Sequence, residues 1–220
     1  ANETQQAMTA TLRNMKRSAK MLRNITNNTT YKKKYQGLPA TTPVPTYDET
    51  PGTWDCWEFW SGTGKLTKFM KRVGLRCGPP LSHETGWCFT LPEHRTEIMR
   101  LYWKHQPRII WGAPLCSPWS LSCTTLDPDV KQVVREQQEE IFKFFQRLCI
   151  EQDKRGQAFG MEQPQGSELL KTTPAKKLLG IGDDEVVHMC MHGLEDPVSK
   201  KPYMKPTIIR KSTAIKMKRT

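Results

Sequence analysis

One cysteine of the chain stands on a stiff stretch of backbone. Cys116 lies in "GAPLCSPWS" (112–120), between Pro114 and Pro118 and just after the apolar run "RIIW" (108–111). Because proline fixes its own φ angle, the thiol has few directions in which to point. Nearby backbone amides can lower the pKa of such a thiol toward that of a reactive thiolate, the nucleophile of covalent catalysis. A lone cysteine is more often an inert small hydrophobe, so its place after a strand is what favours catalysis.

Two further segments have residue types that could do chemistry. The first, "EFWSGTG" (58–64), is a glycine-rich turn, which lets a ligand approach the backbone and the helix amides closely. Glycines also serve ordinary tight turns, so this signal is weak alone. The second, "GMEQPQG" (160–166), puts Glu162 at the end of an apolar run. A carboxylate there is costly to bury unless it has a partner or a task.

The hydrophobic pattern around these segments predicts alternating strands and helices. Strands are expected at 54–60, 75–81, 108–114, 157–164 and 185–191, and helices at 65–73, 92–105, 127–154 and 166–179. Such alternation predicts an α/β fold with a Rossmann-like open, mostly parallel sheet and helices on both faces. Ligand sites in these sheets gather at the carboxyl ends of the strands, where all three segments fall.

Two of the helices show which residues share a face. The helix after the glycine-rich turn ends at Gly74 and places four apolar residues together: Leu66, Phe69, Met70 and Val73. The long helix can be capped by Asp127 and Asp129 and points a longer set inward: Val130, Val133, Val134, Ile141, Phe144, Phe145 and Leu148.

Residues 1–53 are expected to form a basic helix followed by a proline-rich extended arm. Apolar residues recur at helical spacing in 8–25, whereas 27–53 has four prolines and no periodicity. Within the arm, "YKKKY" interleaves tyrosines with three lysines that suit phosphates and stacked bases: Lys32, Lys33 and Lys34. The predicted organisation is an arm (1–53), a body (54–210) and a basic tail (211–220).

The net charge of +12 is carried by the two ends of the chain. Residues 1–53 hold 8 Lys and Arg against 3 Asp and Glu (+5), and residues 196–220 hold 8 against 1 (+7). The middle, residues 54–195, holds 18 against 18 (0). Basic ends on a neutral body suit binding to the phosphate backbone of DNA or RNA through counterion release. Solvated tails that keep the protein soluble are the alternative.

The remaining composition bounds the setting. Seven cysteines without framework spacing and without a secretory leader predict reduced thiols in an intracellular compartment, with the nucleus or a viral or other nucleoprotein particle as candidate locations. The cysteines lack the short paired spacings of a structural zinc site, so no metal is expected. No apolar run approaches the roughly 20 residues that span a bilayer, so no membrane partner is expected either.

The order and spacing of the three segments resemble those of the DNA cytosine-5 methyltransferases over roughly residues 54–210. The glycine-rich motif of that family is similar to "EFWSGTG", its proline–cysteine loop to "APLCSPWS" and its glutamate motif to "MEQP". The resemblance is closer still to diverged methylase-like domains of mobile-element and viral polyproteins. Those domains have a "GW" after the second strand, here Gly86 and Trp87, and a late segment similar to "GLEDPVSKKPYMKPT" (193–207).

The resemblance implies a role for each motif. The Cys116 thiolate would add to carbon 6 of a flipped-out cytosine while Glu162 hydrogen-bonds the ring nitrogen. S-adenosylmethionine would lie over Gly62 and Gly64, with Trp60 alongside. Four further residues would contact nucleic acid: Ser117, Ser120, Lys205 and Arg210.

The chain also departs from the family pattern. Leu115 replaces the proline before the cysteine, Ser82 stands where an acid should hold the cofactor ribose, and Cys88 follows the "GW". Glu84 is a displaced substitute for the ribose-binding acid. Two hypotheses therefore remain open. One is an S-adenosylmethionine-dependent cytosine-5 methyltransferase acting on nucleic acid. The other is a non-catalytic nucleic-acid-binding component of a larger nucleoprotein particle that keeps the fold.

Overall fold

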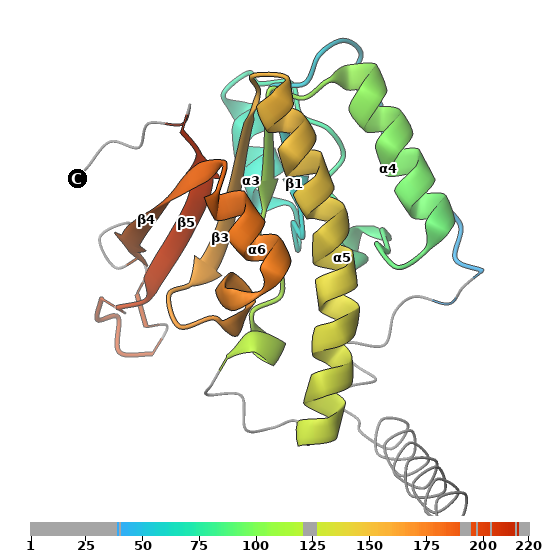
Figure 1. Cartoon of the computed structure of the whole chain (residues 1–220). Helices are drawn as coiled ribbons and strands as arrows, with labels where there is room; N and C mark the ends of the chain where they lie inside the picture. The colour runs from blue at the N-terminus through green and yellow to red at the C-terminus, as the bar shows by residue number, and fades with distance from the viewer. Residues whose placement is uncertain are drawn as a thin grey trace, which may run out of the picture.

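The computed structural model describes residues 39, 41–120, 127–189, 195–196, 198–202, 204–213 and 215. These residues form one five-stranded sheet in the order β1-β2-β3-β5-β4 (Figure 1). The strands are β1 (Cys56–Phe59), β2 (Ile109–Gly112), β3 (Ala158–Pro164), β4 (Gly182–His188) and β5 (Pro206–Ser212). β1, β2 and β3 are parallel, and only β5 runs against both of its neighbours. The predicted open, mostly parallel sheet is confirmed.

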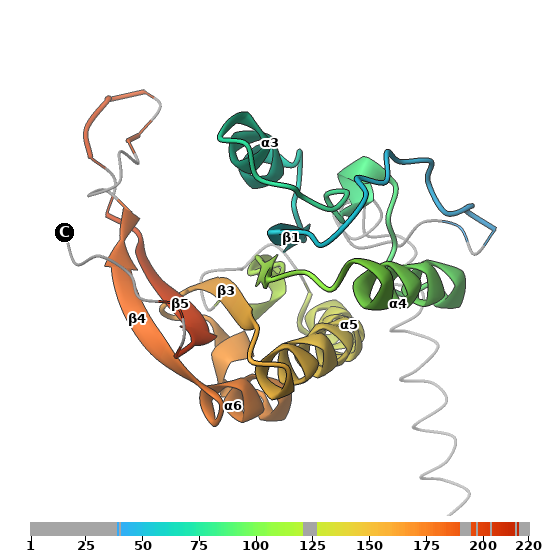
Figure 2. The ribbon, with the colours of Figure 1, turned by 90° about the horizontal axis from the view of Figure 1, so that it is seen from above.

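Helices cover both faces of this sheet, as the Rossmann-like prediction requires. The α-helices are α3 (Lys65–Arg72), α4 (Pro92–His105), α5 (Pro128–Lys154) and α6 (Thr173–Leu179). Short 3-10 segments lie at η1 (His83–Thr85), η2 (Ser117–Trp119) and η3 (Glu168–Lys171). Figure 2 shows α3 on one face and the other three α-helices on the opposite face. None of the helices within the described residues is long and apolar enough to cross a membrane.

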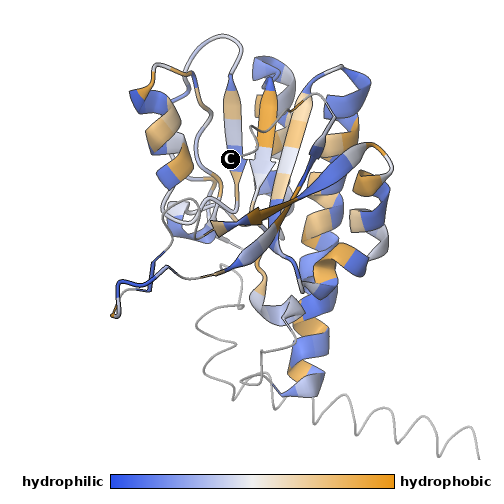
Figure 3. Cartoon of the chain, turned by 90° about the vertical axis from the view of Figure 1, so that its left-hand side faces the viewer, coloured by the Kyte–Doolittle hydropathy of each residue, from blue (hydrophilic) through white to orange (hydrophobic). Residues whose placement is uncertain are grey.

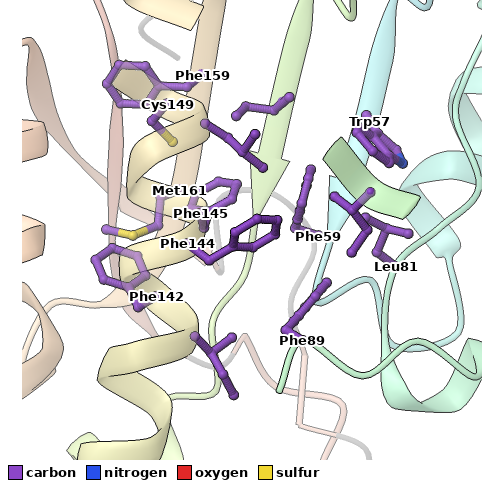
Figure 4. Packing of buried hydrophobic residues seen from close by; sticks show 14 of the residues in the cluster. Trp57, Phe59, Leu81, Phe89, Phe142, Phe144, Phe145, Cys149, Phe159 and Met161 are labelled. Carbon is purple, nitrogen blue, oxygen red and sulfur yellow. The ribbon is translucent and has the colours of Figure 1, made fainter. Parts of the chain in front are cut away.

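The long helix α5 supplies much of the core. The Asp127 carboxylate accepts a hydrogen bond from the Asp129 amide at 2.9 Å, so the predicted cap is confirmed. The residues predicted to point inward are buried, except Val133, which is half-buried. Figure 4 shows how the aromatic side chains of α5 meet those of the strands at the centre of the sheet. This packing fixes the strands whose ends carry the predicted site.

The side of α3 that faces the sheet is not the apolar side that the sequence predicts. Its only fully buried residue is Thr67, whose amide and hydroxyl both donate to the Glu58 carboxylate of β1, at 2.9 and 2.6 Å. Glu58 is itself buried, so this pair determines which side of α3 faces the sheet. Phe69 and Val73 are in consequence exposed, at 58% each.

Strand β5 was not predicted, and the strand predicted at 75–81 is not a regular strand. That segment pairs with β1 through isolated bridges at Cys77 and Leu81 and forms no continuous ladder, because the consecutive prolines between them cannot donate. Strand β5 lies inside the sheet although it contains two buried cations, Arg210 and Lys211. Both cations pair with acids of β4, which single-sequence patterns do not reveal. The predicted boundary at 210 falls within β5.

The last part of the predicted arm is docked on the body. The Glu49 carboxylate binds Arg100 at 3.0 Å, His105 at 2.7 Å and also Lys104, all on α4. Tyr47 packs on Trp87, with ring centroids 5.5 Å apart. Residues 41–53 therefore belong structurally with the body. The helix predicted at 8–25 and the lysines at 32–34 lie outside the described residues.

Candidate active site

The loop that carries Cys116 starts at the carboxyl end of β2. The Ala113 amide donates to the Phe59 carbonyl at 3.2 Å, so the loop leaves the sheet beside the end of β1. Cys116 is half-buried and immediately precedes η2, and its carbonyl accepts a hydrogen bond from the Trp119 amide at 3.0 Å. The two prolines and this turn hold the thiol at the edge where the strands end.

Helix α5 fastens the far side of this loop. The Arg135 guanidinium donates to the Pro118 carbonyl at 2.7 Å and lies over the buried Trp119 ring, 5.4 Å from its centroid. Lys131 donates to the Ser120 carbonyl at 2.9 Å. The loop is therefore held by charged donors, which form stronger hydrogen bonds than neutral ones.

A third anchor joins the loop to β3 and was missed from the sequence. The Gln163 side chain is fully buried, and its amide nitrogen donates to the Pro114 carbonyl. Its amide oxygen accepts from the Ser167 hydroxyl at 2.8 Å. Gln163 thus ties the Cys116 loop to the strand end that carries Glu162. The available signal was an amide next to a predicted catalytic carboxylate at a strand end, where a buried polar group needs partners.

Glu162 has a cationic partner. Its carboxylate lies 3.2 Å from the Lys205 ammonium, which precedes β5 in the chain. Both side chains are partly exposed. The structure therefore brings Glu162 and Lys205 together, and Gln163 links β3, the strand of Glu162, to the Cys116 loop.

Cys116 stands out among the described cysteines. Cys56, Cys77, Cys88 and Cys149 are buried, whereas Cys116 is only half-buried. Burial raises the pKa of the Cys56 thiol to about 12 and raises the pKa of the Cys149 thiol well above its ordinary value. These buried thiols are therefore protonated at neutral pH and shielded from reagents.

The glycine-rich turn lies at the end of β1 and uses its glycines differently. Gly62 has φ +52° and open space where a Cβ would lie, with no heavy atom within 4 Å. At Gly64, φ +70°, a Cβ would meet the Pro80 ring at 3.1 Å. Trp60 also has a positive φ of 52°, and its indole packs edge-on against Phe89 and Phe145. Of these two glycines of the turn, it is Gly62 that leaves its backbone open to a ligand.

The predicted ribose subsite is closed by its own hydrogen bonds. Ser82 is buried, and its hydroxyl donates to the Gly62 carbonyl at 2.8 Å. Glu84 is exposed on η1. Cys88 is buried, its amide donates to the His94 ring at 3.1 Å, and its thiol raises the pKa of His83 through a hydrogen bond. None of these three positions presents a buried carboxylate to the turn.

The predicted nucleic-acid contacts divide into two groups. Ser117, Ser120 and Lys205 lie at or near the carboxyl edge with Cys116 and Glu162. Arg210 is buried instead: it binds both Asp184 carboxylate oxygens, at 2.6 and 2.7 Å, and the Ala175 carbonyl at 2.6 Å. Arg210 therefore serves the fold, and a nucleic-acid contact from it has no support in this geometry. Nowhere in the described residues do three or more His, Cys, Asp or Glu gather as a metal site would require.

An open α/β sheet with its polar residues at the carboxyl edge defines the class of this protein as Rossmann-like. No family model matches the chain, and no curated protein matches it. Among solved structures, the Dnmt2 methyltransferase of S. pombe is similar, with a TM-score of 0.44 and 9% identity. The match covers 76% of this chain and 51% of that chain, so it spans about half the length of that protein.

Proposed function

We propose that the protein is an S-adenosylmethionine-dependent methyltransferase that acts on cytosine in DNA or RNA. The observation that carries this proposal is the Gln163 anchor, which ties the Cys116 loop to the strand end bearing Glu162. A half-buried thiol on a loop fastened to the strand that bears a partly exposed carboxylate would suit nucleophilic attack on a pyrimidine ring.

The chain's own residues would act as follows. The Cys116 thiolate adds to carbon 6 of the flipped base, and the electron pair moves to carbon 5. Glu162 holds the ring nitrogen, and Lys205 keeps the carboxylate in place through their 3.2 Å contact. S-adenosylmethionine, when bound, would supply the methyl group that carbon 5 receives. Transfer of the carbon 5 proton to solvent would then reform the ring double bond and expel the thiolate.

The residues present fit the cofactor only in part. The open backbone at Gly62 allows a ligand to approach the turn closely. The ribose side offers no carboxylate, since the Ser82 hydroxyl is used by Gly62 and Glu84 is exposed. We therefore expect weak binding of S-adenosylmethionine, because a ribose contact to a charged group is lost.

Covalent trapping tests the proposal. Single strands of DNA and of RNA containing 5-fluorocytosine would be incubated with S-adenosylmethionine, and the modified peptide identified by mass spectrometry. We expect an adduct on Cys116 that is lost in Cys116→Ala and slowed in Glu162→Gln. The matched control Cys149→Ala alters a buried thiol and should leave the adduct in place. Labelling of Cys123 instead would refute the assignment.

A nucleic-acid-binding scaffold without catalysis is the second candidate. The hydrogen bond from Ser82 to the Gly62 carbonyl favours it, because this bond closes the subsite where a cofactor ribose would lie. Calorimetry distinguishes the two. A scaffold gives no heat with S-adenosylmethionine while still binding oligonucleotides with strong salt dependence.

A further inference from the structure

The helix α3 and the turn after it present an exposed surface of mixed character. We define this α3 surface by its exposed residues: Lys65, Lys68, Phe69, Lys71, Arg72, Val73 and Leu75. Phe69 and Val73 are each 58% exposed and Leu75 is 37% exposed. Figure 2 shows α3 apart from the other α-helices, and Figure 3 shows orange and blue segments side by side on it. Contiguous apolar side chains rimmed by charge are typical of interaction sites.

The exposure is built into the fold. The Glu58–Thr67 hydrogen bonds fix the rotation of α3, so half of its apolar stripe faces away from the sheet. A helix with this sequence could bury Phe69 and Val73 only by turning Thr67 away from the Glu58 carboxylate. That turn would leave a buried charge without its partners.

The charge on this surface is of one sign. No acidic residue occurs from 59 to 83, a stretch that contains five lysines and arginines. Arg76 lies near Asp55, at 4.0 Å. The other four cations make no ion pair with any carboxylate of the described part of the chain: Lys65, Lys68, Lys71 and Arg72. Residues 54–195 are neutral in sum, yet the α3 side of this stretch is basic.

We propose that the α3 surface binds an acidic, amphipathic segment of a partner protein. Acidic side chains would pair with the four cations, and apolar side chains would cover Phe69, Val73 and Leu75. The whole chain carries +12, and residues 1–53 and 196–220 carry +5 and +7, so a second copy or those ends would approach this surface against a net like charge. The inference does not depend on catalysis at Cys116.

A polypeptide fits this surface better than a nucleic acid does. Bases stack on aromatic rings, so only Phe69 would be used, and the aliphatic Val73 and Leu75 would stay in water. An anionic membrane is also a poorer match, because the helix has only eight residues and the α3 surface has only three exposed apolar side chains with which to enter a bilayer.

Selection from a phage-displayed library of random peptides, each about four helical turns long, tests the proposal. Selection would use the full chain and the variant Phe69→Ser/Val73→Ser, whose sites are exposed and leave the core intact. The matched control is Leu179→Ser, which removes an exposed leucine on α6, at 45%, on the other face. Fluorescence anisotropy would then measure how tightly each protein binds one selected peptide, a thymidine oligonucleotide and vesicles containing phosphatidylserine.

We expect the full chain and Leu179→Ser to enrich acidic peptides with apolar residues at helical spacing. The affinity of the double variant for the selected peptide should be lower by about 30-fold or more, since this variant loses the apolar centre of the interface. Added salt should weaken binding. Three results would overturn the proposal. The first is a selection that enriches no acidic peptide, and the second is a double variant that binds the selected peptide as tightly as the full chain does. The third is a double variant that loses binding to the oligonucleotide or the vesicles but keeps binding to the peptide.

Discussion

On the Cys116 side of the carboxyl edge, side chains from α5 and β3 hold loop carbonyls and leave the thiol half-exposed. On the glycine-turn side, the Ser82 hydroxyl is turned inward onto the turn itself. The first arrangement leaves a thiol half-exposed, whereas the second uses a hydroxyl to stabilise the fold. We call the first the nucleophile half and the second the cofactor half, after the roles that the proposed function would give them. The nucleophile half has the form of an open site, and the cofactor half has the form of a packed core.

Removing the Gln163 anchor should have the largest effect, because it should change both the stability of the protein and the geometry of the nucleophile half. Gln163→Leu leaves the Pro114 carbonyl and the Ser167 hydroxyl without their buried partner, at a cost of about 1–3 kcal/mol in unfolding free energy. The loop would also lose its register with Glu162, so trapping on Cys116 should slow by about 100-fold. Urea unfolding and the rate of adduct formation measure the two effects.

The control for this variant is Gln132→Leu, which changes an exposed glutamine of α5 whose side chain donates to Glu136 in the next turn. Its unfolding free energy should change by less than about 0.5 kcal/mol and its trapping rate should not change. Equal trapping rates in the Gln163 and Gln132 variants would mean that the loop holds its geometry without the anchor.

Substitutions at the two glycines of the turn should separate effects on stability from effects on ligand binding in the cofactor half. Alanine in the left-handed region costs about 1–2 kcal/mol at either position. Gly64→Ala should cost more, because its Cβ meets the Pro80 ring at 3.1 Å. Gly62→Ala meets nothing in the protein, so its added effect should fall on S-adenosylmethionine binding measured by calorimetry. If Gly62→Ala leaves that binding unchanged, the turn does not face the cofactor.

A smaller effect is expected at Ser82. Ser82→Ala removes the hydrogen bond to the Gly62 carbonyl and should lower the unfolding free energy by about 1 kcal/mol. Because the hydroxyl serves the turn, affinity for S-adenosylmethionine should stay the same. A calorimetric affinity that falls with the hydroxyl would show that Ser82 reaches the ligand, contrary to the packed-core description of this half.

The sequence predicted those parts of the molecule that depend on periodicity and local caps. The bounds of α4, the Asp127 cap of α5 and the order of the site segments were all predicted. Pairings between distant residues could not be read in the same way. The Glu58–Thr67 bonds rotate α3, and β5 can lie inside the sheet only because Arg210 and Lys211 meet acids of β4. The Gln163 anchor spans 49 residues, so no local pattern marks it.

Loss of the Glu49 ion pairs of the docked arm should have the smallest effect, and that effect should be on stability alone. Its residue Pro45 lies beside Gly86, at the end of η1, so the arm packs on the cofactor half. Hydrogen bonds from Lys104, Arg100 and His105 lower the pKa of Glu49 from 4.5 to about 2. A depressed pKa contributes stability that is fully present above the unfolded value of 4.5 and is lost as the pH falls toward 2.

Thermal unfolding of the wild type and Glu49→Gln across this pH range measures that contribution. At pH 7 the variant should melt roughly a few degrees lower, because a partly exposed ion pair contributes little. The difference should shrink as the pH falls below 4.5 and disappear only below about 2, where the Glu49 carboxyl is mostly protonated in the folded protein as well. Activity at Cys116 should not follow this titration, because the nucleophile half is fastened by α5 and β3 and not by the arm. Parallel loss of melting temperature and trapping would show that the two halves are coupled.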